Sequence, residues 1–310
     1  MQETTESVNQ PGLYELDDMN RDQLIASAPL ALKWSKEHCS AKPQGGMEEW
    51  AKKQNGSTVA AELTCDWYHG TWQLLRLLNM VAVPPWYEFY HEALVSVLLK
   101  KPDANILISG AADYGMICTL HQAVVASGTS PTITLCDICP TPILESQWYA
   151  ERNGFSFQST SANLLTDPRF VVPQYDLIVT DEFLTVLKDP DKPLIVSRWL
   201  QALNPGGTVV TTAMMGGPTT PELRRAYADR ALAGLEREAE TIQQLGIERE
   251  ELVGCFEQFA SNHTRHMLSG GEQQLRTLFS AFKVEFMEPI VTPGECVNPT
   301  TSFQIVASKG

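Results

Sequence analysis

The chain has 310 residues, of which 43% are hydrophobic and 19% are charged, so it can bury a full core. Its net charge of −14 repels phosphate backbones, and no cluster of Lys and Arg offsets that charge, so we expect no nucleic-acid partner. No apolar run approaches the roughly 20 residues of a membrane helix, so we expect no membrane partner. Seven scattered cysteines behind an acidic, polar start favour reduced thiols and a cytoplasmic location. The expected substrate is therefore a small molecule.

The first hundred residues have a helical texture. Apolar residues recur at helical spacing from Tyr14 to Lys101, as at Leu24, Ala28 and Leu32, and no clear alternating strand is visible. Turn-forming residues at 43–46 and 84–85 interrupt the pattern. This predicts that residues 1–100 form a helical N-terminal cap or lid segment.

From residue 101 the texture changes, because short apolar runs alternate with longer amphipathic stretches. That alternation is typical of βαβ units and predicts an α/β fold, doubly wound around a mostly parallel sheet. We expect helices at about 114–127, 142–152 and 191–203. The expected strands of this part are Asn105–Ser109, Thr132–Cys136, Gly154–Gln158, Tyr175–Thr180 and Gly207–Thr212.

The C-terminal part predicts how the sheet ends. A charged, helix-favouring insertion occupies about 218–268, and a helix is expected over Glu272–Phe282. The strands expected at Lys283–Pro289 and Thr301–Ser308 follow each other without a crossover helix, so they should pair antiparallel. Residues 101–310 are thus predicted to form one Rossmann-like domain, with a seven-stranded sheet that includes a final antiparallel strand.

Small or acidic residues follow the predicted strands at the places where ligands of open α/β sheets bind. The first strand runs into Gly110-Ala111-Ala112-Asp113-Tyr114, whose small residues let a ligand approach the backbone. Asp137 ends the second strand and can accept hydrogen bonds from both ribose hydroxyls. Ser159–Asn163 follows the third strand, and Leu203–Gly207 precedes the fifth. The stretch Tyr175–Phe183 contains the fourth strand and ends with two carboxylates, Asp181 and Glu182.

This order of stretches resembles that of the class I S-adenosylmethionine-dependent methyltransferases, over about two thirds of the chain. The resemblance implies S-adenosyl-L-methionine as the cofactor, with the first turn against its methionyl part and the stretch after the third strand along its adenine. The implied cofactor-binding residues are Gly110, Ala111, Ala112, Asp113, Tyr114, Asp137, Ile138, Ser161, Ala162, Asn163, Asp181, Glu182 and Phe183.

The sequence departs from the family pattern in the first turn. Ile108 stands where an acidic residue is usual, and Ala112 replaces the second glycine. The carboxylate that often binds adenine is also missing, with Ser161 or Asn163 as substitutes. The amino group of the cofactor therefore needs another partner, either Asp113 or backbone carbonyls.

Aromatic residues gather in the N-terminal segment and suggest a substrate pocket. Such residues mostly pack a core, but aromatic faces also attract a desolvated cation such as a sulfonium by about 0.5–2 kcal/mol each. Both interpretations stay open for the expected pocket residues, which are Trp67, Trp72, Trp86, Tyr87 and Tyr90. The catalytic candidates are Tyr68, His69 and Tyr175, because a histidine can act as a base near neutral pH and a tyrosine hydroxyl can orient an amine.

Two further patterns of possible metal ligands predict no metal site. Cys136 and Cys139 have C-x-x-C spacing, but that pair straddles a strand end and has no second pair. His263 and His266 have i, i+3 spacing without a neighbouring Cys or acidic ligand, so we expect a surface pair.

The expected function is methyl transfer to a small molecule by direct displacement, which needs alignment of the reactants more than acid or base groups. The alternative is cyclisation of S-adenosylmethionine itself to azetidine-2-carboxylate and methylthioadenosine, as in the azetidine-2-carboxylate synthases of the same superfamily. A nicotinamide dehydrogenase and a non-catalytic binding module are kept as further classes, although the chain has no G-x-G-x-x-G motif. The oligomeric state stays open, with a homodimer as one alternative.

Overall fold

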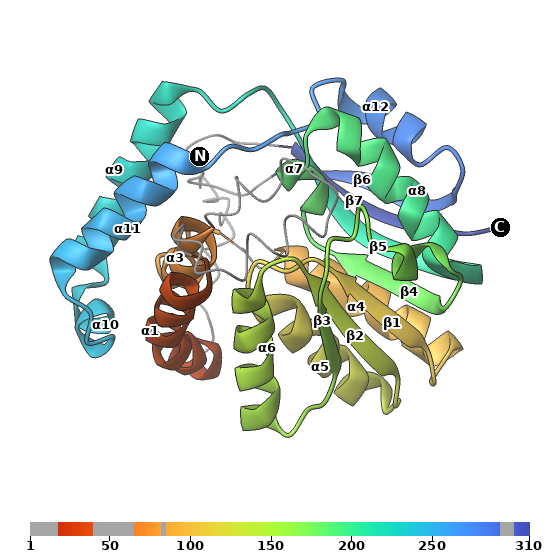
Figure 1. The fold of residues 1–310 in the computed structure, drawn as a ribbon, viewed down its shortest axis with the longest axis horizontal. Helices are drawn as coiled ribbons and strands as arrows, with labels where there is room; N and C mark the ends of the chain where they lie inside the picture. Colours follow the sequence, from red (N-terminus) through yellow and green to blue (C-terminus); the bar gives the residue numbers. More distant parts are fainter. Residues whose placement is uncertain (1–17, 40–64, 82–84, 292–300) are drawn as a thin grey trace, which may run out of the picture.

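A seven-stranded sheet organises the molecule in the computed structural model, which describes residues 18–39, 65–81, 85–291 and 301–310. The strand order is β3-β2-β1-β4-β5-β7-β6. β7 runs antiparallel to both of its neighbours, whereas the five strands from β1 to β5 pair in parallel (Figure 1). The predicted α/β class and the antiparallel strand are therefore confirmed. The strands are β1 (Asn105–Ser109), β2 (Thr132–Asp137), β3 (Gln158–Ser161), β4 (Tyr175–Thr180), β5 (Leu203–Met215), β6 (Lys283–Val291) and β7 (Thr301–Ser308).

Alternate residues of the strands face two separate hydrophobic cores, as the period of two in a strand requires. Ile106 and Ile108 of β1 join one core, whereas Leu107 joins the other. The first core packs under α4 (Pro85–Lys100), α5 (Gly115–Ser127) and α6 (Pro140–Asn153). The second packs under α8 (Lys192–Ala202) and α12 (Gly271–Leu278). Both faces of the sheet are thus covered, which is why its strands read as apolar runs.

The third strand lies later in the chain than the sequence predicts. Gly154 does not begin a strand but ends α6, with a left-handed φ of 64° at its C-cap. The amide of Phe155 then donates to the carbonyl of Ala150, 2.9 Å away, and closes the helix. The expected strand Gly154–Gln158 is therefore wrong, because a helix-ending glycine resembles a strand-opening one in sequence. β3 pairs with β2 from Gln158 to Ser161.

Helices from two distant parts of the chain form a second body beside the sheet, at the left of Figure 1. α1 (Asp18–Cys39) packs against α3 (Asp66–Leu77), and α3 packs against α11 (Arg249–Asn262). The latter belongs to the segment after β5, together with α9 (Pro221–Arg237) and α10 (Ala239–Gln244). We call α1, α3, α9, α10 and α11 the helical cap.

α4 belongs to the predicted N-terminal cap by sequence, but it packs on α5 and β5 of the sheet domain. The helical cap contacts the sheet domain through α1 and α3, which both pack against α6. In the part of the chain that the structure describes, no helix combines the length and apolar character needed to cross a bilayer. The remaining short helices are α7 (Phe183–Val186) and two 3-10 turns, Pro168–Val171 and Asp189–Asp191.

Candidate active site

The carboxyl ends of neighbouring parallel strands bring the predicted cofactor-binding stretches to one edge of the sheet. Ser109 of β1 lies beside Cys136 of β2, and Asp137 lies beside Ser161 of β3. β4 pairs with β1 on the other side and ends at Thr180. The turn at Gly110 and the carboxylates at 137 and 181 therefore follow adjacent strands, at the edge where open α/β sheets bind ligands.

Asp137 and the turn after β1 are in direct contact. The amide of Ala111 donates to Oδ2 of Asp137, 2.9 Å away, and the amide of Cys139 donates to Oδ1, 2.7 Å away. The residue is 7% exposed. Burial raises the pKa of this carboxyl to about 6, although His69 and the Ala111 amide oppose the shift. The edge thus holds a buried carboxylate that is fixed by two backbone N–H groups.

Gly110 needs both its missing side chain and its backbone freedom. Its φ is +81°, in the left-handed region that favours glycine. A Cβ added there would lie 2.5 Å from the ring of Phe183. The ring of Phe183, from the start of α7, therefore lies directly on the turn that follows β1.

The residues after β4 form a second polar group at the same edge. Asp181 accepts hydrogen bonds from the hydroxyls of Tyr90, at 3.0 Å, and Thr212, at 2.7 Å. Burial raises the pKa of Asp181 as well. Glu182 has a φ of +49°, which is strained for a residue with a side chain. Tyr90 is 1% exposed, so this expected pocket residue belongs to the core and reaches the site only with its hydroxyl.

The stretch after β3 lies next to Asp137. The Ala162 amide donates to the backbone carbonyl of Asp137, 3.0 Å away, and the Ser161 hydroxyl donates to that of Ile138, 3.2 Å away. Asn163 uses its side-chain oxygen to accept from the Leu165 amide. The stretch after β3 and Asp137 therefore lie side by side at the carboxyl edge of the sheet.

The side chains of Asp113 and Tyr114 are buried against other protein groups and do not line an open part of the site. Arg76 of α3 forms an ion pair with Asp113, and both side chains are buried. The other carboxylate oxygen of Asp113 accepts from the Gly115 amide at 2.7 Å. Tyr114 is 1% exposed and stacks on Tyr149 at 5.2 Å. Asp113 therefore connects the turn to the helical cap, and its expected role as partner of the cofactor amine is replaced by this ion pair.

Tyr175 cannot be a catalytic residue of this site. It is the first residue of β4, at the end of the strand opposite to Asp181. Its side chain is 5% exposed in the second hydrophobic core, and burial raises the pKa of the phenol. The prediction put Tyr175 on the correct strand, but at the end that lies away from the carboxyl edge of the sheet. The length of the strand therefore separates Tyr175 from the candidate site. The side chains of Trp86 and Tyr87 lie outside the described residues.

The helical cap presents an aromatic cluster, whose members are Trp67, Tyr68, Trp72, Tyr227, Phe259 and His263. Tyr68 stacks on Phe259 at 5.9 Å, and Phe259 stacks on Tyr227 at 5.7 Å. Burial raises the pKa of Tyr68, and Asp181 and Asp137 both add to that shift through their charge. Tyr68 of α3 therefore lies within electrostatic range of the two carboxylates at the sheet edge.

His263 is part of this cluster, so the expected surface pair with His266 is wrong. Its ring lies 4.7 Å from that of Phe259, and burial, aided by Arg265 and Arg224, holds its pKa well below the usual range. The amide of His266 donates to the Thr185 carbonyl at 2.7 Å. Sequence reasoning missed Tyr227, Phe259 and His263, because no local pattern says which face of the insertion packs against α3.

His69, another residue of α3, touches the turn itself. Its Nδ1 lies 2.9 Å from the carbonyl oxygen of Ala112. Burial alone would lower the pKa of His69, but Cys139, Asp137 and the Ala112 carbonyl together raise it to about 10. A histidine that keeps its proton is no base at neutral pH, so the expected role as general base is not supported by this environment.

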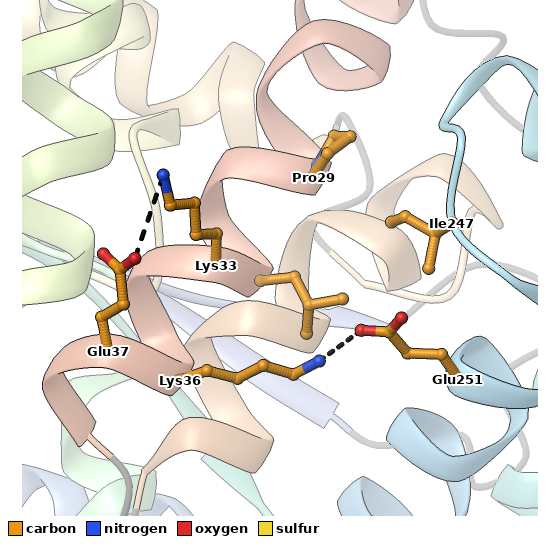
Figure 2. Close-up of a pocket in the computed structure, with 7 residues that line it drawn as sticks. Pro29, Lys33, Lys36, Glu37, Ile247 and Glu251 are labelled. Carbon is orange, nitrogen blue, oxygen red and sulfur yellow. Dashed lines mark hydrogen bonds and ion pairs between the residues drawn. The ribbon is translucent and has the colours of Figure 1, made fainter.

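A separate surface groove of about 360 Å³ lies between α1 and the start of α11. Figure 2 shows Lys36 pointing at Glu251 across it and Lys33 pointing at Glu37 along α1. No lining residue comes from the carboxyl edge of the sheet. The groove is therefore a seam within the helical cap and is distinct from the candidate site.

Comparisons with known proteins give distant structural similarities. No protein-family model and no curated protein matches the chain. TehB from Haemophilus influenzae is 12% identical, with a TM-score of 0.46 over 77% of this chain and 66% of its own. The N-methyltransferase NodS from Bradyrhizobium japonicum, solved with S-adenosyl-L-homocysteine, is 16% identical, with a TM-score of 0.43 over 71% of this chain and 85% of its own.

A protein assigned as a zinc-dependent alcohol dehydrogenase from Rhodobacter sphaeroides is similar to the same degree. It is 10% identical, with a TM-score of 0.47 over 79% of this chain and 98% of its own. Similarity at this level therefore does not distinguish one chemistry from another. The function has to be argued from the site.

Proposed function

We propose that the protein is an S-adenosylmethionine-dependent enzyme that acts on a small molecule. The observation that carries this proposal is the 2.9 Å hydrogen bond between the Ala111 amide and the Asp137 carboxylate. It joins the small-residue turn after β1 to the acid that ends β2. In a nucleoside cofactor with an aminoacyl tail, the ribose and the tail then have adjacent sites on one rim.

The residues of the edge fit this cofactor. Asp137 offers a buried carboxylate to the ribose hydroxyls, and the small residues Ala111 and Ala112 of the turn let a ligand approach its backbone. Ser161 and Asn163 would face the adenine, and Tyr68 of the aromatic cluster lies within electrostatic range of Asp137. S-adenosylmethionine would supply an electrophilic carbon on a positively charged sulfur.

The protein's own contribution is placement and exclusion of water. Tyr68 keeps its phenolic proton because its pKa is raised, so it can donate a hydrogen bond but does not act as a base. The partly exposed ring of Tyr68 suits a cationic ligand, and the buried ring of Phe259 supports it by stacking. Alignment of this kind supplies several kcal/mol of a displacement barrier without a catalytic acid or base. The structure of the site therefore supports methyl transfer to a compact acceptor.

One observation favours cyclisation of S-adenosylmethionine as a second candidate. α3 contacts the turn after β1 twice, through His69 on the Ala112 carbonyl and through Arg76 on Asp113. Both contacts lie where the aminoacyl tail is expected. A covered tail is what an intramolecular attack needs, because no acceptor has to enter there.

The nucleoside product distinguishes the two candidates. Purified protein is incubated with S-adenosylmethionine alone, and the products are identified by mass spectrometry. Methyl transfer predicts no turnover until a small-molecule acceptor is added, and then S-adenosylhomocysteine. Methylthioadenosine with a cyclic amino acid would replace methyl transfer by cyclisation. Calorimetry that detects binding of NAD but not of S-adenosylmethionine would refute both.

A further inference from the structure

Three metal-ligand side chains meet where the helical cap touches the edge of the sheet. Within the described residues, Cys65, His69 and Cys139 place one donor atom each within 4.8 Å of the others. We propose that this group binds one zinc-class divalent ion, which connects α3 to the start of α6. The proposal does not depend on the identity of the cofactor.

The local folds of two helices create the arrangement. Cys65 is the N-cap of α3, and His69 lies four residues later, so both side chains share one face of that helix. Cys139 is the N-cap of α6, two residues after Asp137. The C-x-x-C pattern of Cys136 and Cys139 gives no metal site, because Cys136 is buried in the second hydrophobic core. The sequence expectation of no metal site therefore missed partners that are 70 or more residues away.

The spacing of the donors suits tetrahedral zinc better than a disulfide. Zinc binds thiolate sulfur at about 2.3 Å and imidazole nitrogen at about 2.0–2.1 Å, so tetrahedral donors lie roughly 3.5–3.8 Å apart. The two sulfurs are 3.4 Å apart, close to that value. A disulfide needs about 2.05 Å between the sulfurs. A shift of either thiol by a few tenths of an ångström would bring the two sulfurs to the spacing of zinc ligands.

The surroundings of His69 are those of a metal ligand. Its Nδ1 donates to the Ala112 carbonyl over 2.9 Å, which fixes the ring and leaves Nε2 as the donor toward a cation. Metal-bound histidines characteristically donate their other ring N–H to a carbonyl or carboxylate in this way. Two cysteines and one histidine form a ligand set of catalytic type, in which the fourth position holds water.

A bound ion would hold the helical cap on the site. Both cysteines would lose their thiol protons and His69 would lose its Nε2 proton to solvent, and the two thiolate charges would then balance the cation. The Cys139 amide donates a hydrogen bond to the Asp137 carboxylate over 2.7 Å, so an ion bound to Cys139 would also fix that carboxylate. Metal binding and ligand binding should therefore support each other.

Cobalt(II) titration of the full chain tests the proposal. The protein is reduced, treated with a chelator, desalted and titrated with Co²⁺, whose thiolate charge-transfer and d–d absorption report tetrahedral sulfur ligation. We expect saturation at one equivalent and displacement by Zn²⁺. Cys65→Ser and Cys139→Ser should weaken binding by about 100-fold or more, because even loss of a supporting contact around a metal ligand costs 10–100-fold.

Two further variants keep the result interpretable. Cys255→Ser, which changes a half-buried cysteine on α11, should bind Co²⁺ as the parent protein does. Cys65→His should still bind one Co²⁺ but with about half the thiolate charge-transfer intensity, since one sulfur remains. Circular dichroism checks that each variant is folded.

Three outcomes would overturn the proposal. Binding that leaves no thiolate absorption would place the ion elsewhere. Equal affinity in the parent protein and in folded Cys139→Ser would do the same. Reduced protein that binds no Co²⁺, while air-oxidised protein shows a Cys65–Cys139 disulfide by peptide mass mapping, would make this pair a redox site instead.

Discussion

The sheet edge and the helical cap build the same site by different means. At the sheet edge, backbone groups fix the functional carboxylate, because the amides of Ala111 and Cys139 both donate to Asp137. In the helical cap, side chains make the contacts, as His69 does with Ala112 and Arg76 with Asp113. Backbone contacts depend on the fold alone, whereas side-chain contacts depend on single residues.

This difference shows where the protein is open to change. A substitution in the helical cap can break the contacts of the helical cap with the turn after β1 without altering the sheet. A substitution of Asp137 removes the carboxylate that the backbone amides at the sheet edge bind. The ion pair of Arg76 with Asp113 is a buried connection between the two regions, and removal of one partner would leave a buried charge unpaired.

Arg76→Met should have the largest effect on stability. The side chains of Arg76 and Asp113 are 7% and 6% exposed, so removal of the cation leaves an uncompensated buried carboxylate. Loss of one partner of such a pair costs about 3–5 kcal/mol. Urea unfolding followed by circular dichroism should show this loss. The matched control is Arg237→Met, whose half-exposed pair with Glu238 should contribute less than about 1 kcal/mol.

Adding Asp113→Asn to Arg76→Met tests whether the unpaired charge of Asp113 causes the loss of stability. Asparagine keeps an oxygen for the Gly115 amide but carries no charge, so the double variant should recover part of the lost stability. If the double variant loses as much unfolding free energy as the two single variants together, the ion pair is not what connects the helical cap to the turn.

Asp137→Asn should have the largest effect on cofactor binding. Hydrogen bonds to a charged group contribute about 1.5–3 kcal/mol each, so losing a carboxylate that serves two ribose hydroxyls should weaken binding by about 100-fold or more. Isothermal calorimetry with S-adenosylmethionine measures this. Asp176→Asn is the control, because Asp176 stands on β4 at the opposite end and bonds Lys101, Asn105 and Asn204. Equal losses in the two variants would mean that Asp137 has no special role.

Much of the sheet was predictable because local rules and the fold agree there. β1 and β4 lie where the apolar runs predict them, and the antiparallel order follows from the short connection between β6 and β7. Asp137 and Gly110 could be located because a strand end defines their place. The predicted start of β3 was wrong because Gly154 caps the end of α6 and does not begin a strand.

The helical cap could not be derived in the same way. Its cluster of Trp67, Phe259 and Tyr227 joins residues that are far apart in the chain, and helical periodicity says which face is apolar but not which helix covers it. The environment of His69 likewise depends on Cys139, on a different helix. Contacts between distant helices carry no local signal.

Ligand affinity should rise with pH between about 5 and 7. The pKa of Asp137 is raised to about 6 in the folded protein, from 3.8, by burial, so it ionises in this range. Its facing groups are His69, Cys139 and the Ala111 amide, and in the metal-free protein the His69 pKa of about 10 keeps that ring charged throughout. The ionised carboxylate accepts ribose hydrogen bonds best, so the association constant should increase about tenfold.

The free energy of unfolding of the ligand-free protein should fall as the pH rises, opposite to the trend in ligand affinity. A carboxyl whose folded pKa is raised contributes its stability at low pH and loses that contribution as the pH rises through about 6. Unfolding and calorimetric titrations across this range check both signs. Asp137→Asn should remove both trends, and their persistence in that variant would assign them to another group.

Tyr68→Phe should have the smallest effect and is the sharpest test of the helical cap's role in chemistry. The ring keeps its stacking on Phe259, so the free energy of unfolding should hardly change. The variant loses a protonated hydroxyl that lies within electrostatic range of Asp137 and Asp181. Product formation from S-adenosylmethionine should therefore fall about tenfold or less, as for one neutral hydrogen bond. Tyr149→Phe, which removes a hydroxyl 3.1 Å from His121, should leave turnover unchanged. Equal turnover in both variants would make the aromatic cluster a packing surface only, and the helical cap would then matter to the site through its contacts with the turn alone.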